Sequence, residues 1–262
     1  MAKIDDIYDD QDITPKARGS IHKTILSWFS EQQKGKVLDA PAGFGHLSMR
    51  LKEIGFDVVC GEIEPEIFKV SGLRCIYTDL NERIESPDDA FDYVCCVDGL
   101  EHMTNPYRAV QEFTRVLKPG GYGIFSVPNY SNMEKRSKFF FHGYLTKPKS
   151  FDDYARSGGN LFNFHNSPVT ITLINLMFEI NGLEIECILR DKIKTRQYLW
   201  LPVVLLLKLA ALFQSEKNRR KYRYDLTLKN EVILGGNTLI FITRKKHASS
   251  QGAVQAAAVQ CG

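Results

Sequence analysis

The pattern that most constrains the fold of this chain is an alternation of short apolar runs with amphipathic segments between residues 35 and 129. The fourth run is apolar throughout, as expected for a strand that is buried on both faces. We predict strands within 36–40, 57–63, 74–80, 90–100 and 122–129, helices at 46–55, 64–72 and 105–117, and a turn at 118–121. Strands that alternate with helices of this length predict right-handed crossovers and a parallel sheet.

The rhythm changes after residue 129. Residues 130–165 are rich in Lys, Gly and aromatic residues, so we expect a long functional loop or lid there. A helix is predicted next, with Ser167 as its N-cap, Pro168 at its first position and Gly182 at its C-cap. The last two strands are expected at 183–189 and 237–245, separated by an insertion of different composition at 190–230.

The length suits one large domain that carries an insertion. We predict an N-terminal region at 1–34 whose helix at 21–33 covers the sheet, a main domain at 35–247, and a disordered low-complexity tail at 248–262. The acidic N-terminus has no apolar run, so we expect no secretory signal. The six cysteines form no metal-type pair and predict reduced thiols in a cytoplasmic protein. A net charge of +3 is too small to imply a nucleic-acid partner.

The stretch VLDAPAGFGHLS, residues 37–48, predicts a ligand site where the first strand ends. Gly43 and Gly45 allow the backbone to approach a ligand closely. The stretch lacks the third glycine of a dinucleotide turn and the lysine of a phosphate-binding loop. Asp39 has no basic residue beside it, and a carboxylate favours a cation over a diphosphate. A ligand with adenine, ribose, a positive charge and no phosphate is S-adenosylmethionine, which is the cofactor we predict.

Two more carboxylates follow strands of the same sheet. Glu62 ends the second strand, where an acidic side chain can accept hydrogen bonds from both ribose hydroxyls. Asp79 ends the third strand, where a carboxylate can accept a hydrogen bond from the adenine amino group. Helix capping or a solvated turn would also explain an acid at either position, most readily at Asp79.

Together these motifs resemble the class I S-adenosylmethionine-dependent methyltransferases. The similarity covers about 35–130 well, above all FDYVCCVDGLEHMTNPYRAVQEFTRVLKPGGYGIFSVPN, and extends more loosely to 245. Pro41 replaces the glycine usual in the family, and this Pro-Ala turn resembles a subgroup found in bacterial polysaccharide and cell-envelope biosynthesis. The resemblance implies a Rossmann-like α/β fold with a seven-stranded, mostly parallel sheet whose last strand is antiparallel and whose two faces are covered by helices.

Two histidines are candidate bases for methylation of an oxygen acceptor. His102 follows Glu101 directly after the fourth strand, and His165 precedes a predicted helix. We expect His165 to act on the substrate and His102 to lie on the cofactor side, oriented by Glu101. Each histidine could instead have only a structural role. We expect no function for His22.

The other candidate site residues lie in or near these motifs. For the cofactor we predict Asp39, Ala40, Gly43, Gly45, Glu62, Ile63, Asp79, Leu80, Asp98, Gly99 and His102. For the substrate we predict Asn129, Tyr130, His142, Tyr144 and His165. No metal site is expected, because no acidic or histidine cluster has ligand spacing along the sequence.

The insertion contains an almost wholly apolar run, 199–213, between basic flanks. Residues 190–223 carry ten Lys and Arg against two acidic residues. Such a helix is too short for a comfortable membrane span, but it can lie on an anionic membrane surface. A dimer helix or a core helix would have the same composition. We predict peripheral contact of 197–224 with the inner face of the cytoplasmic membrane; the oligomeric state stays open.

Four functions are compatible with the sequence. We favour an O-methyltransferase that acts on a sugar or a lipid-linked glycan intermediate. The main alternative methylates a quinone, lipid or secondary metabolite in an apolar pocket supplied by the run Phe139–Phe141 and by Tyr144. An RNA methyltransferase is less favoured because the string of Leu and Val in the insertion is a poor surface for a nucleic-acid strand and has no aromatic residues interleaved through it. A non-catalytic cofactor-binding module is the fourth possibility.

Overall fold

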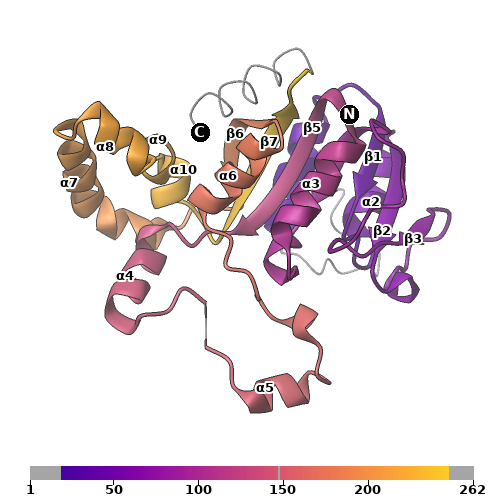
Figure 1. Cartoon of the computed structure of the whole chain (residues 1–262), viewed down its shortest axis with the longest axis horizontal. Coiled ribbons are helices and arrows are strands. Elements are labelled where there is room, and N and C mark those ends of the chain that lie inside the picture. Colours follow the sequence, from indigo (N-terminus) through magenta and orange to yellow (C-terminus); the bar gives the residue numbers. More distant parts are fainter. Residues whose placement is uncertain (1–18, 147, 248–262) are drawn as a thin grey trace, which may run out of the picture.

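A computed structural model describes residues 19–146 and 148–247 of the chain. It contains a seven-stranded sheet with the strand order β3-β2-β1-β4-β5-β7-β6 (Figure 1). The strands are β1 Lys36–Asp39, β2 Asp57–Glu62, β3 Cys75–Tyr77, β4 Phe91–Cys96, β5 Leu117–Pro128, β6 Leu183–Arg190 and β7 Thr238–Lys245. Residues 1–18 of the predicted N-terminal region and the tail predicted at 248–262 lie outside the described residues.

The sheet confirms the predicted fold class. Strands β1 to β5 pair in parallel, whereas β7 pairs antiparallel with both β5 and β6. The chain builds β1, β2 and β3 toward one edge and then returns to place β4 on the other side of β1. Ligands bind at such a reversal, at the carboxyl ends of the strands. The topology therefore places a binding crevice beyond the ends of β1 and β4.

Two hydrophobic cores lie on opposite faces of the sheet, because successive strand residues point to opposite sides. Leu38 packs in the core under α3 Pro106–Val116 and α6 Ile171–Ile180. Its neighbour Val37 packs in the core under α1 Gly19–Phe29 and α2 His46–Glu53. The helix predicted at 21–33 is thus confirmed as a covering helix.

The prediction of a helix at 64–72 is wrong. Only a single 3-10 turn, η2 Pro65–Ile67, forms there. Phe68 adopts an extended backbone, and Lys69 donates its N–H to the carbonyl of Phe44 at 3.2 Å. The Phe68 ring closes against the backbone of the glycine turn at Gly45. Packing of this aromatic ring and the tie to Phe44 replace the helical hydrogen bonds.

Two further boundaries differ from the sequence prediction. Helix α6 begins at Ile171 with Thr170 as its N-cap, so Ser167 is not the cap and Pro168 is not the first helical residue. Ser167 instead donates its hydroxyl to the carbonyl of Met103 at 2.8 Å, and this hydrogen bond ties the segment to the loop after β4. The turn predicted at 118–121 is part of the long strand β5.

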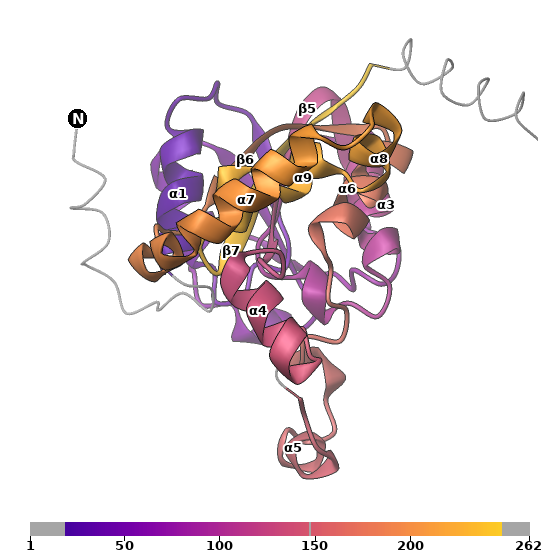
Figure 2. The same cartoon turned by 90° about the vertical axis from the view of Figure 1, so that its left-hand side faces the viewer.

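The segment predicted as a loop or lid contains short helices: α4 Met133–His142, α5 Phe151–Arg156 and η4 Leu161–Asn163. The insertion forms η5 Thr195–Trp200, α7 Leu201–Leu212, α8 Glu216–Lys221, α9 Tyr224–Thr227 and α10 Asn230–Ile233. Figure 1 shows these helices beside the β6–β7 end of the sheet, with α5 extended away from the main body, and Figure 2 shows α7 and α4 on one face. A small third core joins α4, α7 and α10 through Met133, Val204 and Ile233.

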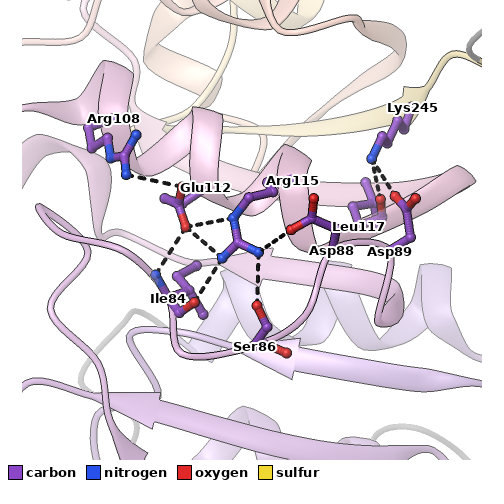
Figure 3. Close-up of polar contacts among 9 residues, drawn as sticks. All are labelled: Ile84, Ser86, Asp88, Asp89, Arg108, Glu112, Arg115, Leu117 and Lys245. Carbon is purple, nitrogen blue, oxygen red and sulfur yellow. Dashed lines mark hydrogen bonds and ion pairs between the residues drawn. The ribbon is translucent and has the colours of Figure 1, made fainter.

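Arg115 fixes the connection between β3 and β4 (Figure 3). Its guanidinium donates to the carbonyls of Ile84 and Ser86 and forms ion pairs with Asp88 and the buried Glu112. Lys245 binds the neighbouring Asp89 in the same way. These contacts lie near the beginning of β4, at the sheet edge opposite to the binding crevice, and their role is to hold the fold.

Candidate active site

The glycine turn begins where β1 ends and leads into α2. The Ala40–Pro41 peptide bond is cis, and Gly43 and Gly45 have left-handed φ values of 56° and 91°. Gly45 is also the N-cap of α2. A Cβ atom on Gly45 would lie 2.5 Å from the ring of Phe68. Glycine is therefore required at this position both by its backbone angle and by the packing of the turn.

Asp39 is a buried carboxylate at the base of the turn, with 1% of its surface exposed. The hydroxyl of Ser48 donates to its Oδ2 at 2.5 Å. Burial, together with a smaller effect of the nearby Glu62, raises the pKa of Asp39 to about 7 against the opposing effect of the hydrogen bond from Ser48. A cationic ligand would offset the cost of keeping this carboxylate ionised.

Glu62 holds the glycine turn in place. Its Oε2 accepts the backbone N–H of Gly43 at 2.7 Å, and its Oε1 accepts the N–H of Ile63 at 3.0 Å. Asp79 accepts hydrogen bonds from both the backbone and the side chain of Asn81 through Oδ1. Each carboxylate keeps lone pairs for a ligand, because a carboxylate can accept about four hydrogen bonds.

One cavity of about 890 Å³ joins these residues, which is the size range of small-molecule sites. Most of the predicted site residues line it: Asp39, Gly43, Glu62, Ile63, Asp79, Leu80, Asp98, Gly99, His102, Tyr130 and His165. The segment 130–165 also contributes Lys135, Thr146, Lys149, Asn160, Phe162 and Phe164, none of which was predicted individually. The segment predicted as a functional loop or lid therefore borders the cavity.

Five predicted residues do not line the cavity. Ala40 is fully buried and Gly45 acts only through the backbone of the turn. Asn129 is buried, donating its amide to the carbonyl of Val232 and accepting the N–H of Ser131. His142 and Tyr144 stack on each other at the end of α4, with ring centroids 5.8 Å apart. The structure therefore does not support a substrate role for Asn129, His142 and Tyr144.

His22, for which no function is expected from the sequence, lines the cavity from α1. Its Nδ1 lies 2.9 Å from Nδ1 of His46, and the two rings stack. Burial lowers the pKa of His22 to about 3, with a further contribution from His46, so His22 is neutral. One ring must donate and the other accept. The signal that could have found it is a histidine next to Ile21 on the buried face of an amphipathic helix.

At the other end of the cavity lie Glu101, His102 and His165, whose ligand-type atoms all lie within 4.8 Å of one another. The two imidazole rings meet edge to face with centroids 4.9 Å apart. His102 donates Nδ1–H to the carbonyl of Phe164 at 3.0 Å, since a carbonyl can only accept. The prediction that Glu101 orients His102 is therefore wrong, because Phe164 orients the ring.

Glu101 and His165 have shifted pKa values. Burial raises the pKa of Glu101 to about 8, and the negative charge of Asp98 adds to the shift. Burial lowers the pKa of His165, and His102 lowers it further. The hydroxyl of Tyr130 lies 3.3 Å from Nδ1 of His165. A neutral imidazole with a hydroxyl partner can accept a proton from a substrate at neutral pH.

Comparisons with known proteins agree with this geometry. Residues 38–125 match the family model described as "Methyltransferase domain". The chain is 32% identical over 103 residues to a ubiquinone biosynthesis O-methyltransferase of Xanthomonas oryzae pv. oryzae (strain PXO99A), covering 36% of this chain and 43% of that protein. It is 31% identical over 122 residues to the Pectobacterium atrosepticum protein of the same name, covering 42% and 51%. The chain thus spans about half the length of these relatives.

Solved structures share the fold. A putative methyltransferase from Bacillus halodurans C-125 superposes with a TM-score of 0.54 at 17% identity, covering 86% of this chain and 98% of the other. A protein from Pyrococcus horikoshii OT3 superposes with a TM-score of 0.56 at 18% identity, covering 90% and 94%. At these identities the likeness establishes the fold alone.

The sheet order, the acidic strand ends and the family match over 38–125 agree with a methyltransferase domain of the S-adenosylmethionine-dependent kind. The family match implies S-adenosylmethionine as the cofactor, as predicted from the acidic glycine turn. The matched segment runs from β1 into β5 and contains Asp39, Glu62, Asp79 and His102, so it holds most of the predicted cofactor site.

Proposed function

We propose that this protein transfers the methyl group of S-adenosylmethionine to a hydroxyl oxygen of a small, hydroxylated, lipid-borne molecule such as a quinone precursor. The observation that carries the proposal is the neutral His165, paired with Tyr130, in the same cavity as the cofactor carboxylates. The curated relatives are named for O-methylation in ubiquinone biosynthesis, which favours this substrate class over a sugar.

The chemistry follows from the geometry of the cavity. The acceptor oxygen attacks the methyl carbon in line with the sulfonium, the carbon–sulfur bond breaks, and S-adenosylhomocysteine leaves as a neutral thioether. His165 takes the proton that the acceptor hydroxyl loses, and Tyr130 steadies the imidazole through Nδ1. Alignment of the two reactants supplies much of the acceleration, and the base supplies roughly a further 10²–10⁴-fold.

Substitution of His165 tests this assignment. We expect His165→Ala to bind S-adenosylmethionine as the wild type does and to lose at least 100-fold in turnover. His142→Ala is the matched control, because His142 is exposed at the end of α4 and lies outside the cavity. Turnover is measured with a hydroxylated phenol that carries an apolar tail. Full activity of His165→Ala would overturn the assignment.

A second candidate acceptor is a sugar hydroxyl, as in a lipid-linked glycan intermediate. The observation in its favour is the polar lining that Lys149, Asn160 and Asn237 contribute to the cavity. Methyl transfer from labelled cofactor to a lipid-linked sugar, in parallel with the tailed phenol, decides between the two. Absence of transfer to either, with cofactor still bound, would favour a non-catalytic module.

We also propose that the insertion holds the protein on an anionic membrane surface from the cytoplasmic side. The segment Thr195–Leu212 is apolar and long enough to cross a membrane by length and composition, and only 17% of it is buried. Both ends of the insertion meet at the sheet, because Thr238 donates its N–H to Asp191 at 3.2 Å. A helix that crossed the membrane once would leave the chain on the far side, away from the sheet. We therefore place α7 along the membrane surface.

The charges around α7 support this orientation. Leu206 and Leu209 are 65% and 51% exposed, and the adjoining α8 presents exposed basic side chains that attract anionic headgroups. The insertion rejoins the sheet at Asn237 and Thr238, which line the cavity. A membrane-bound acceptor would therefore enter close to the surface that holds the enzyme.

Vesicle flotation tests the membrane proposal. We expect the wild type to float with phosphatidylglycerol vesicles at low salt and the double variant Leu206→Glu/Leu209→Glu to remain in solution. Leu173→Glu/Leu176→Glu on α6 is the matched control, since these leucines are similarly exposed at 42% and 50%. Equal flotation of both variants would refute a specific role for α7. Binding of RNA in place of vesicles would favour the nucleic-acid alternative.

A further inference from the structure

The cluster of Glu101, His102 and His165 has the composition of a metal site. The two histidines are far apart in the sequence, and the fold brings them together: His102 ends η3 Leu100–His102 after β4, and His165 follows η4. One ligand-type atom of each residue lies within 4.8 Å of the others. This spacing requires only small side-chain movements for all three atoms to reach one ion at about 2.0–2.2 Å.

Glu101 points to a ligand independently of the histidines. Its side chain is 1% exposed, and its Oε2 has no hydrogen-bond partner although it lines the cavity. A buried polar atom without a partner is costly and is usually explained by a missing ligand, ion or water. One oxygen of Glu101 lies within 4.8 Å of a ring nitrogen of each histidine, and a carboxylate beside two imidazoles suits a cation that displaces its proton.

The histidines are held in the state that binds metals. His102 donates Nδ1–H to the carbonyl of Phe164, so its Nε2 keeps the lone pair. Metal-ligating histidines typically donate their other ring N–H to such a carbonyl, which fixes the tautomer and the ring orientation. His165 contacts Tyr130 through Nδ1 and likewise keeps one ring nitrogen for an ion.

We propose that Glu101, His102 and His165 bind a divalent transition-metal cation of the Zn²⁺ type. One carboxylate and two imidazoles suit such ions better than Mg²⁺ or Ca²⁺, which prefer oxygen ligands. Three protein ligands leave open positions toward the cavity, as in metal sites that act on substrates.

The catalytic use of this ion rests on the proposed function. In the loaded protein the lone pair of His165 is engaged by the cation, and the positive charge lowers the pKa of an acceptor hydroxyl in the cavity. The proton then leaves to solvent without passing through the imidazole. His165 is needed for turnover whether it acts as the base or as a metal ligand. Only its role as a metal ligand makes turnover sensitive to chelators.

Calorimetric titration of the full chain with Zn²⁺, and with Mg²⁺ for comparison, tests the site without an acceptor or turnover. We expect one Zn²⁺ per chain, at least tenfold weaker binding in both Glu101→Gln and His165→Ala, and weaker binding of Mg²⁺ than of Zn²⁺. His142→Ala is expected to bind Zn²⁺ as the wild type does, because His142 lies outside the cluster. His165 is exposed, so His165→Ala stays informative even if Glu101→Gln unfolds.

The outcomes separate this inference from the proposed function. No binding of Zn²⁺ to the wild type, or equal binding to the wild type and His165→Ala, overturns the metal site and leaves methyl transfer standing. Specific Zn²⁺ binding without methylation of any hydroxylated acceptor supports the site and overturns the proposed reaction. Loss of turnover on chelation, with recovery on adding Zn²⁺, supports the metal site and methyl transfer, and assigns His165 as a metal ligand in place of the base.

Discussion

The buried carboxylate of Asp39 makes a quantitative prediction about stability. Its pKa is about 7 in the folded protein and 3.8 in the absence of burial. The folded state therefore holds the Asp39 proton more tightly than the unfolded state does. This contribution to stability is complete below about pH 4 and is lost as the pH rises through 7.

Replacement of Asp39 by Asn removes this pH dependence while keeping the size of the side chain and an oxygen that accepts from Ser48. Between pH 5 and pH 7 the wild type loses about 1.4 kcal/mol per pH unit relative to the variant, or about 3 kcal/mol in total. In a domain of this size that corresponds to roughly 6–12 °C in melting temperature. The cofactor-free Asp39→Asn protein is thus expected to melt above the wild type at pH 8.

Thermal unfolding at several pH values between 5 and 8, with and without S-adenosylmethionine, measures the pH dependence of stability and the stabilisation by the cofactor. The wild type is expected to gain more from the cofactor than the variant, because only the ionised Asp39 attracts a cationic ligand. Asp57→Asn is the matched control, since Asp57 is exposed at the beginning of β2. A difference between Asp39→Asn and the wild type that stays constant from pH 5 to pH 8 would refute the reasoning.

Three further changes have defined outcomes. Glu62→Gln weakens the acceptor that holds the glycine turn, and calorimetry is expected to show about 10- to 100-fold weaker binding of S-adenosylmethionine. Gly45→Ala is expected to abolish cofactor binding through the clash in the turn, whereas Gly143→Ala, also at positive φ but with nothing within 4 Å, retains it. Arg115→Met leaves the buried Glu112 short of a partner, so urea denaturation is expected to show a loss of about 3 kcal/mol with cofactor affinity unchanged.

The sheet and the cofactor site could be predicted from the sequence because both depend on local signals. Strand periodicity, the glycine turn and an acid at each strand end are readable in short windows, and the carboxyl ends of parallel strands meet at one edge. Asp39, Glu62 and Asp79 could therefore be placed together without knowledge of the packing.

The remaining features depend on contacts between distant residues. The segment 64–72 has helical spacing, but packing of Phe68 against the glycine turn overrides it. Ser167 is a suitable N-cap by type, yet its hydroxyl binds the loop after β4. The histidine cluster was invisible for the same reason, because no local spacing relates His102 to His165. Likewise, no local motif links His22 to His46.

The insertion leaves the sheet after Asp191 and returns to it at Thr238, where these two residues are hydrogen-bonded to each other. Antiparallel neighbours such as β6 and β7 can be joined by a two-residue turn, so the pairing of these strands does not depend on the length of the connection between them. Within this connection Leu226 and Val232 pack in the main core, whereas Leu206 and Leu209 of α7 are exposed. Substitutions on the exposed face of α7 can therefore change where the enzyme works without rebuilding the strands that hold the cofactor.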